Sequence, residues 1–274
     1  MSVWPSDYIE NVINDVEKYE GIRKTIKAGF IERCAVRYCS PNELHPNPDD
    51  EFSMVEVGPN LEIVGNYVKE IQYNLKHGMV IYEEPVIVQK MEPDGYILLN
   101  GHHRWFAAIR MRINKIHIKI VNLINEADLN RMIDKTPNYK LASFDFDEVL
   151  LSADENNMAP VADSLFARKI KERLRRGAPE VIRDFKEKGY DICVYTAGYF
   201  DEEEFCDFFS MYDLDVDIVV NGINNKRTSK DGSRESMRDL IRNKYKETVH
   251  VDNESLIRVN HETKEYEVLD FTWP

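Results

Sequence analysis

Apolar positions recur every three or four residues in two stretches of the N-terminal half, residues 7–28 and residues 60–76. This spacing puts the apolar side chains on one face of a helix. Asn60 can cap the second stretch, and Gly78 follows it where glycine commonly ends a helix. We therefore expect an N-terminal helix within residues 1–28 and a second helix over residues 60–76.

A period of two replaces the helical spacing between residues 85 and 123. Alternating apolar and polar side chains are typical of half-buried strands, and residues 92–95 have the composition of a hairpin turn. In chain order we expect strands at 85–91 and 96–99, a helix from residue 101, a strand at 113–123 and a helix at 126–135. Residues 136–139, which contain a proline, are the expected domain boundary.

From residue 140 onward, short apolar strands alternate with amphipathic helices. Such alternation indicates a parallel sheet with helices on both faces. The expected strands are 141–144, 191–195, 217–220 and 248–251, and the expected helices are 162–175, 179–188, 202–211 and 233–244. Alternating apolar residues between 256 and 268 indicate a closing hairpin.

The composition is that of a globular protein, with 43% hydrophobic and 31% charged residues over 274 positions. This length favours two domains. The net charge of −13 is shared by both halves, so duplex DNA is an improbable partner, whereas one local basic pocket still suffices for a nucleotide. We see no signal peptide, no apolar run long enough for a membrane span and no cysteine pattern typical of zinc or disulfides. A cytoplasmic location without membrane contact is expected.

Acidic and hydroxyl side chains follow the predicted strands at their carboxyl ends. Asp145 and Asp147 follow the first strand, Thr196 the second and Asp252 the last. Ligands of parallel sheets bind beyond these ends, and neighbouring carboxylates need a cation or a shared proton. Mg²⁺ takes one or two carboxylates and keeps positions for water and phosphate. The pattern therefore indicates a magnesium-dependent phosphate site, while two solvated acids at a strand end are the alternative for Asp145 and Asp147 alone.

The order of these residues resembles the haloacid-dehalogenase-like (HAD) hydrolase superfamily from residue 140 to the end. The D-x-D-x-[TV] motif of the family falls on residues 145–149, its Ser/Thr motif on Thr196 and its acidic metal motif on Asp252. The family lysine corresponds to Lys230, at a predicted helix start, or to Lys226, at the more usual distance from Asp252. For the second acid of the metal motif, Glu254 is the nearest candidate, and Asn253 is the alternative that would replace an acid there.

The resemblance implies that Asp145 attacks phosphorus to form an aspartyl-phosphate, and that Asp147 protonates the leaving oxygen and then activates water. It also implies Mg²⁺ held by Asp145, Asp252 and the main-chain carbonyl of Asp147, with Thr196 and the lysine on the phosphoryl oxygens. Little sequence is inserted between the motifs, so the cap is minimal. In this superfamily an open site implies a phosphorylated macromolecule more often than a small metabolite.

A second cluster of polar residues, Gly101, His102, His103 and Arg104, follows a predicted strand and opens a helix. Glycine lets the backbone approach a phosphate, and a helix N-terminus favours an anion. Arg104 and the histidines can add hydrogen-bond donors. A polar helix cap with Trp105 in the core is the alternative interpretation.

This turn, together with the proline-rich loop of residues 43–48, resembles the ParB/sulfiredoxin fold over residues 29–136. Members of this fold use a G-x-x-R turn to bind the phosphates of ATP or CTP. Sulfiredoxins place a catalytic cysteine where this chain has His102, so that activity is not expected. Free-serine kinases of the fold take a general base from the proline-rich loop, and the candidates here are Glu43, Asp50 and Glu51.

The sequence thus predicts an α/β protein with an N-terminal ParB/sulfiredoxin-like α+β domain and a Rossmann-like three-layer α/β HAD domain over residues 140–274. The leading hypothesis is a Mg²⁺-dependent phosphatase coupled to an ATP- or CTP-binding domain. One alternative is a bifunctional kinase and phosphatase that phosphorylates a small hydroxyl compound such as serine. The other is a non-enzymatic nucleotide-sensing or partner-binding protein.

Overall fold

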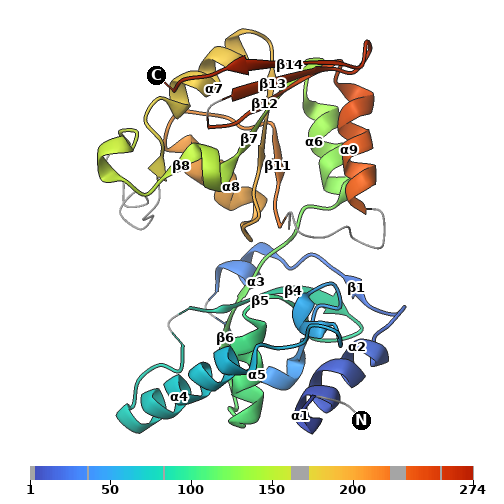
Figure 1. Cartoon of the computed structure of the whole chain (residues 1–274), viewed down its shortest axis with the longest axis vertical. Coiled ribbons are helices and arrows are strands. Elements are labelled where there is room, and N and C mark those ends of the chain that lie inside the picture. Colours follow the sequence, from blue (N-terminus) through green and yellow to red (C-terminus); the bar gives the residue numbers. More distant parts are fainter. Residues whose placement is uncertain are drawn as a thin grey trace. The chain divides into compact units, whose positions relative to one another are not determined.

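The computed structural model describes residues 4–35, 37–82, 84–161, 173–222, 233–253 and 255–273. The chain folds into two compact units, Met1–Asn122 and Leu123–Pro274 (Figure 1). They are called the N-terminal unit and the C-terminal unit. None of the helices in the described ranges is long and apolar enough to cross a membrane.

The N-terminal unit is built on a mixed sheet in the strand order β2-β6-β4-β5-β3, with β1 paired to β4. The central strand β4 runs antiparallel to β5 and parallel to β6, so the hairpin predicted around residues 92–95 is present. The strands are β1 Lys24–Thr25, β2 Arg37–Cys39, β3 Leu44–His45, β4 Val86–Glu92, β5 Tyr96–Asn100 and β6 Ile116–Ile120.

Two long helices and several short ones pack on this sheet around one hydrophobic core. The helix predicted over residues 60–76 is confirmed, since Asn60 caps its start and Gly78 ends it with φ 66°. The helices are α1 Ser6–Tyr8, α2 Asn14–Lys18, α3 Phe30–Cys34, α4 Leu61–His77 and α5 His102–Arg110, with the π-helical turn η1 Ile9–Ile13 between α1 and α2, and the 3₁₀ turns η2 Pro41–Glu43 and η3 Glu51–Ser53.

The N-terminal helix is shorter than predicted, because the helical run that begins at Ser6 ends at Lys18. Gly21 turns the chain with φ 72°, and the next residues form β1 on the edge of β4. Ile22 and Ile26 continue the helical spacing, but Ile22 is 59% exposed, while the amide of Ile26 donates to the Lys90 carbonyl. The helical spacing of apolar residues therefore extends past Lys18, although the helix itself ends there.

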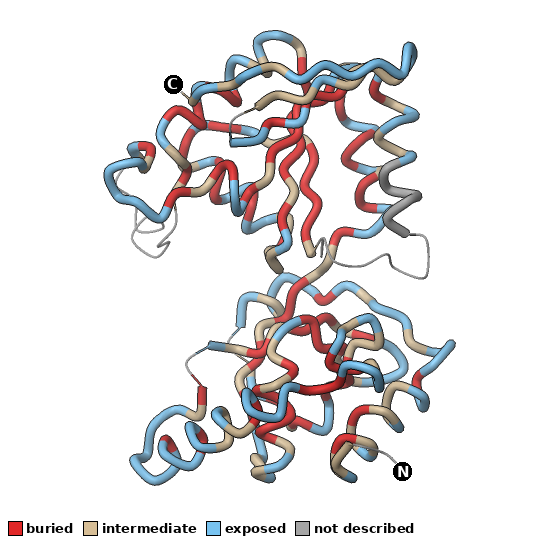
Figure 2. Tube along the Cα trace, in the orientation of Figure 1, coloured by how far each residue is buried: buried red, intermediate tan, exposed pale blue. Residues whose placement is uncertain are grey.

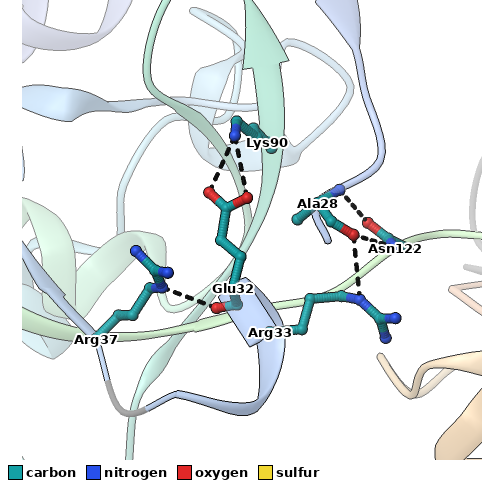
Figure 3. Close-up of polar contacts among 6 residues, drawn as sticks. All are labelled: Ala28, Glu32, Arg33, Arg37, Lys90 and Asn122. Carbon is teal, nitrogen blue, oxygen red and sulfur yellow. Dashed lines mark hydrogen bonds and ion pairs between the residues drawn. The ribbon is translucent and has the colours of Figure 1, made fainter. Parts of the chain in front are cut away.

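Polar contacts tie the short helix α3 and the residues before it to the rest of the N-terminal unit (Figure 3). The Glu32 carboxylate accepts from Lys90 Nζ at 3.0 Å, and the Glu32 carbonyl accepts from Arg37 Nε at 2.8 Å. Before the helix, Ala28 exchanges two hydrogen bonds with the side chain of Asn122, at 2.9 and 3.1 Å. These contacts fasten the segment before residue 31 to the rest of the N-terminal unit.

The C-terminal unit contains the parallel sheet that the alternation predicted. Four parallel strands lie in the order β11-β10-β7-β12, and an antiparallel hairpin of β13 and β14 extends the sheet beyond β12. The central strand β7 is buried along most of its length (Figure 2). The strands are β7 Lys140–Asp145, β10 Asp191–Tyr195, β11 Ile218–Val220, β12 Glu247–Val251, β13 Ser255–Asn260 and β14 Glu265–Asp270.

Helices cover both faces of this sheet (Figure 1). Alternate residues of β7 pack into different hydrophobic cores. Phe144 packs into the core under α7 Ala178–Glu187 and α8 Glu202–Ser210. Leu141 packs into the core under α6 Glu126–Lys135 and α9 Ser233–Lys244. This is the period-two pattern of a strand buried on both sides.

The structure bears on two predictions about this region. The domain boundary expected at residues 136–139 stays a prediction, but Leu129 and Ile133 of α6 pack in the core of the C-terminal unit, so the compact units divide before α6. The predicted helix over residues 162–175 lies mostly outside the described residues, and at its end Arg173–Leu174 form the strand β9, paired with β8 Leu151–Ser152.

Candidate functional site

The turn that opens α5 requires glycine at its first position. Gly101 has φ 94°, a left-handed conformation that other residues adopt at a cost. A Cβ atom there would lie 3.2 Å from the Arg104 guanidinium and 3.3 Å from the Val86 side chain. The absence of this atom lets the guanidinium fold back over the start of the helix.

Arg104 is held mainly by the segment before β4. Its Nη1 donates to the Glu84 carbonyl at 3.0 Å and to the Glu84 carboxylate at 3.2 Å, and its own carbonyl accepts from the Tyr82 hydroxyl at 2.7 Å. The Arg104 side chain is only 10% exposed, whereas that of Glu84 is 84% exposed. A phosphate at this turn would therefore compete with a carboxylate that water can readily solvate.

Both histidines of the turn accept hydrogen bonds from backbone amides. His102 Nε2 accepts from the Asn47 amide at 3.4 Å, and His103 Nε2 accepts from the Asn60 amide at 3.1 Å. Burial lowers the pKa of His102 to about 4 and also lowers the pKa of His103. Both rings are neutral near pH 7, so Arg104 supplies the positive charge of this turn.

Of the three acids proposed as a general base, Asp50 is the one that the structure places beside the turn. Its Oδ2 lies 3.8 Å from His102 Nδ1, and its Oδ1 accepts from the Phe52 amide at 2.9 Å. The Glu43 carboxylate is occupied in a capping box, where it accepts from the Ser40 amide at 2.9 Å. Glu51 lies on the exposed side of η3.

In the C-terminal unit, the predicted site residues gather at one edge of the sheet. Strands β10 and β12 both pair with β7 in parallel, so their carboxyl ends meet the carboxyl end of β7. Asp145 is the last residue of β7, Thr196 follows β10 directly and Asp252 follows β12 directly. The parallel pairing of these strands, predicted from the alternation, is confirmed, and the roles of the three side chains stay predictions.

Asp147 and Thr196 form the central contact of this edge. Thr196 is fully buried, and its hydroxyl donates to Asp147 Oδ2 at 2.5 Å. The Ala197 amide donates to the same oxygen at 3.2 Å, and the Gly198 amide donates to the Thr196 hydroxyl at 2.8 Å. Asp147 itself is exposed, so its carboxylate is fixed in position and remains open to solvent.

Asp145 caps the π-helical turn that carries Asp147, η4 Phe146–Leu150. Its Oδ1 accepts from the Glu148 amide at 2.9 Å, which orients the carboxylate beyond the strand end. Burial raises the pKa of Tyr195 to about 12, and the nearby carboxylates of Asp145 and Asp252 add to this rise. Both carboxylates thus act electrostatically on one phenol at this edge.

The described residues contain no group of three or more His, Cys, Asp or Glu side chains placed to hold a metal ion. The predicted Mg²⁺ set uses only the main-chain carbonyl of Asp147, whose carboxylate accepts from Thr196, so it stays a prediction. Two carboxylates, Asp145 and Asp252, remain as oxygen donors, a number that suits Mg²⁺. The candidates Lys226, Lys230 and Glu254 lie outside the described residues.

Sequence reasoning missed the residues that reach these sites from distant segments. Glu84 on Arg104 and Phe52 between the histidine rings, with centroids 5.5 Å from His102 and 5.1 Å from His103, carry no motif of their own. In the C-terminal unit, Arg175 Nη2 reaches the Glu148 carbonyl at 3.4 Å. Only the proline-rich composition of the loop around Phe52 marked that region in advance.

Comparison with known proteins identifies part of the chain. Residues 31–134 match the ParB N-terminal domain family. An uncharacterized protein of Methanocaldococcus jannaschii is 31% identical over 145 residues, which cover 52% of this chain and 48% of that protein. The chain thus spans about half the length of this curated relative.

Among solved structures, a C-terminally truncated chromosome-partitioning protein ParB from Caulobacter crescentus, crystallised with CTP-gamma-S, is similar at 20% identity and a TM-score of 0.25. The alignment covers 38% of this chain and 56% of that chain. The ParB match begins at residue 31, so the helical run at residues 6–18 and strand β1 precede the matched domain.

Proposed function

We propose that this chain, whose residues 31–134 match a ParB N-terminal domain, joins a nucleotide-binding unit to a Mg²⁺-dependent phosphatase unit of the HAD type. The phosphatase proposal is carried by one observation, the Thr196–Asp147 hydrogen bond at the ends of adjacent parallel strands. It fixes one acid of the D-x-D pair in the crevice where ligands of such sheets bind.

In the proposed reaction, an Asp145 oxygen attacks the phosphorus of a phosphate monoester, and the bond from phosphorus to the leaving oxygen breaks. Protonated Asp147 gives its proton to that oxygen. Asp147 then takes a proton from water, whose oxygen attacks the aspartyl-phosphate and releases inorganic phosphate. Thr196 holds Asp147 in place for both proton transfers, and Mg²⁺ bound by Asp145 and Asp252 would supply positive charge for the phosphoryl oxygens.

The first test is hydrolysis of p-nitrophenyl phosphate with Mg²⁺ by the wild type and by Asp145→Asn. We expect the substitution to lower turnover at least about a thousand-fold, because it removes the nucleophile. Glu148→Gln is the matched control, since it neutralises an exposed acid on the same turn and should retain turnover. Full activity in a folded Asp145→Asn variant would refute the mechanism.

The proposed nucleotide site is the turn at residues 101–104, where Gly101 admits close approach and Arg104 carries the charge. ATP and CTP are both candidates. Equilibrium binding of each nucleotide should weaken at least about tenfold in Arg104→Ala, which removes a charged donor. Arg110→Ala is the control, because Arg110 sits at the other end of α5 and forms an ion pair with Asp7 at 2.8 Å. Equal losses in both variants would argue against a site at the turn.

A kinase activity in the N-terminal unit is the second candidate, and the position of Asp50 beside His102 favours it. Asp50 would take the proton of a small hydroxyl substrate such as serine. The wild type, supplied with ATP and serine, should then form phosphoserine, and Asp50→Asn should not. Absence of this product from the wild type would leave nucleotide binding as the role of the unit.

A further inference from the structure

Two buried hydrogen-bond donors stand next to each other in the C-terminal unit without an acceptor. Within the described residues, Arg175 Nε and Trp273 Nε1 have no hydrogen-bond partner. The Arg175 guanidinium lies over the Trp273 ring, with Cζ 5.5 Å from the ring centroid. An unsatisfied buried donor destabilises the fold, and a charged one does so more. One acceptor-rich ligand would satisfy both donors.

The location of this pair is set by contacts with the turn that carries Asp147. The Arg175 amide donates to the Leu150 carbonyl at 2.7 Å, and Arg175 Nη2 donates to the Glu148 carbonyl at 3.4 Å. Arg175 therefore spans the second half of η4, the turn that Asp145 caps.

Trp273 reaches the same place through the topology of the sheet. Strand β12 is parallel to β7, and two antiparallel pairings lead from β12 to β14, so β14 ends at the same edge as β7. The residues after β14 turn back over the core, where Phe271 and Trp273 pack against each other at 5.1 Å. The C-terminal segment thus places Trp273 against Arg175, which itself contacts η4.

We infer that Arg175 and Trp273 bind a second phosphate group of the substrate, beside the phosphate that Asp145 attacks; this assignment rests on the phosphatase function proposed above. A phosphate presents several oxygens at once, so it can accept from the guanidinium and from the indole together. The carboxylates of Asp145, Asp147 and Asp252 make the edge acidic, and a second anionic group needs a cation such as Arg175 to remain there.

The test compares adenosine 3′,5′-bisphosphate and a 5′-phosphorylated dinucleotide with AMP, which has one phosphate. The second phosphate is a monoester in the bisphosphate and a diester in the dinucleotide, so the two substrates distinguish which form Arg175 and Trp273 bind. The wild type should prefer at least one of them in kcat/KM, and Arg175→Gln should reduce that preference about tenfold or more, as for loss of a charged hydrogen bond. Trp273→Phe keeps the ring, removes the donor and should reduce the preference about threefold. Arg176→Gln, the matched control on the exposed neighbour, should keep it.

Thermal unfolding separates the failure of this inference from failure of the phosphatase proposal. If the wild type hydrolyses no phosphate ester, the phosphatase proposal fails, and the inference then depends on binding. In that case the bisphosphate should raise the Tm of the wild type and of Arg176→Gln but not of Arg175→Gln. The inference is overturned if the wild type shows neither a preference for two phosphates nor an Arg175-dependent Tm shift. It is also overturned if Trp273→Phe lowers the Tm while the preference stays unchanged, since the indole would then be structural.

Discussion

The turn at residues 101–104 and the sheet edge at Asp145 present opposite surroundings to a phosphate. At the turn, His102 and Arg104 are buried, and their polar atoms contact Asn47 and Glu84. At the edge, Asp147 is exposed, and its carboxylate is oriented by one hydroxyl and one amide. The turn is closed and carries a cation, whereas the edge is open and acidic.

The two sites therefore oppose the binding of an anion in different ways. At the turn, a ligand must displace a carboxylate that already contacts Arg104, so affinity depends on breaking an internal ion pair. At the edge, a ligand displaces no carboxylate from an ion pair among the described residues. The carboxylates there repel an anion until a cation binds beside them. Three substitutions and one change of pH test this contrast.

Asp147→Asn should lower the kcat of phosphate ester hydrolysis by about 10²–10⁴-fold, the usual contribution of general acid–base catalysis. The fold should survive, because an amide oxygen can still accept from Thr196 and Ala197. Steady-state kinetics of Asp147→Asn and of His102→Gln, measured side by side, test whether the two sites function independently. A comparable loss in His102→Gln would show that the buried turn also controls the open edge.

Acid should destabilise the N-terminal unit through His102. Its pKa is about 4 in the fold, below the ordinary 6.5, because burial outweighs the attraction of Asp50. The unfolded chain therefore takes up this proton first, so stability is complete above pH 6.5 and falls between pH 6.5 and 4. The loss is at most about 3 kcal/mol.

Denaturant unfolding followed by fluorescence at several pH values measures this slope. His102→Gln should flatten it, while the smaller downward pKa shift of His103 leaves a residual slope of the same sign. An unchanged slope in His102→Gln would mean that the ring is not buried in solution.

Gly101→Ala should cost about 1–2 kcal/mol, because alanine is strained in the left-handed conformation and its Cβ would crowd Arg104. Gly65→Ala is the matched control. Gly65 lies inside α4 with open space around it, so alanine there should stabilise by about 0.5–1 kcal/mol. Chemical denaturation measures both changes, and the same sign for both would contradict the proposed geometry of the turn.

Glu84→Gln should give the smallest effect, an increase in nucleotide affinity of up to about fivefold. The exposed Glu84 carboxylate contributes no more than about 1 kcal/mol to its pair with Arg104, and a ligand no longer has to displace it. Isothermal titration with ATP and CTP provides the measurement. Weaker binding in Glu84→Gln would indicate that Glu84 positions Arg104 for the ligand.

Local sequence signals predicted those elements whose ends are set by nearby residues. Asn60 and Gly78 bound α4, and the turn before Tyr96 closes the β4–β5 hairpin. The polar strand ends at Asp145 and Thr196 were also predicted, because parallel strands share one carboxyl edge. The helix predicted over residues 7–28 was wrong after Lys18, since an apolar period does not reveal which core its side chains enter.

The caps, the turns, the alternation of β7 and the order of the acids along the chain follow from local sequence, because each depends on residues a few positions apart. Long-range packing sets the position of α6 in the C-terminal unit, the contact of Glu84 with Arg104 and the contact of Trp273 with Arg175. These contacts join segments up to about a hundred residues apart. Their partners are selected by sheet topology and by which buried surfaces fit, and neither is encoded in any local run of residues.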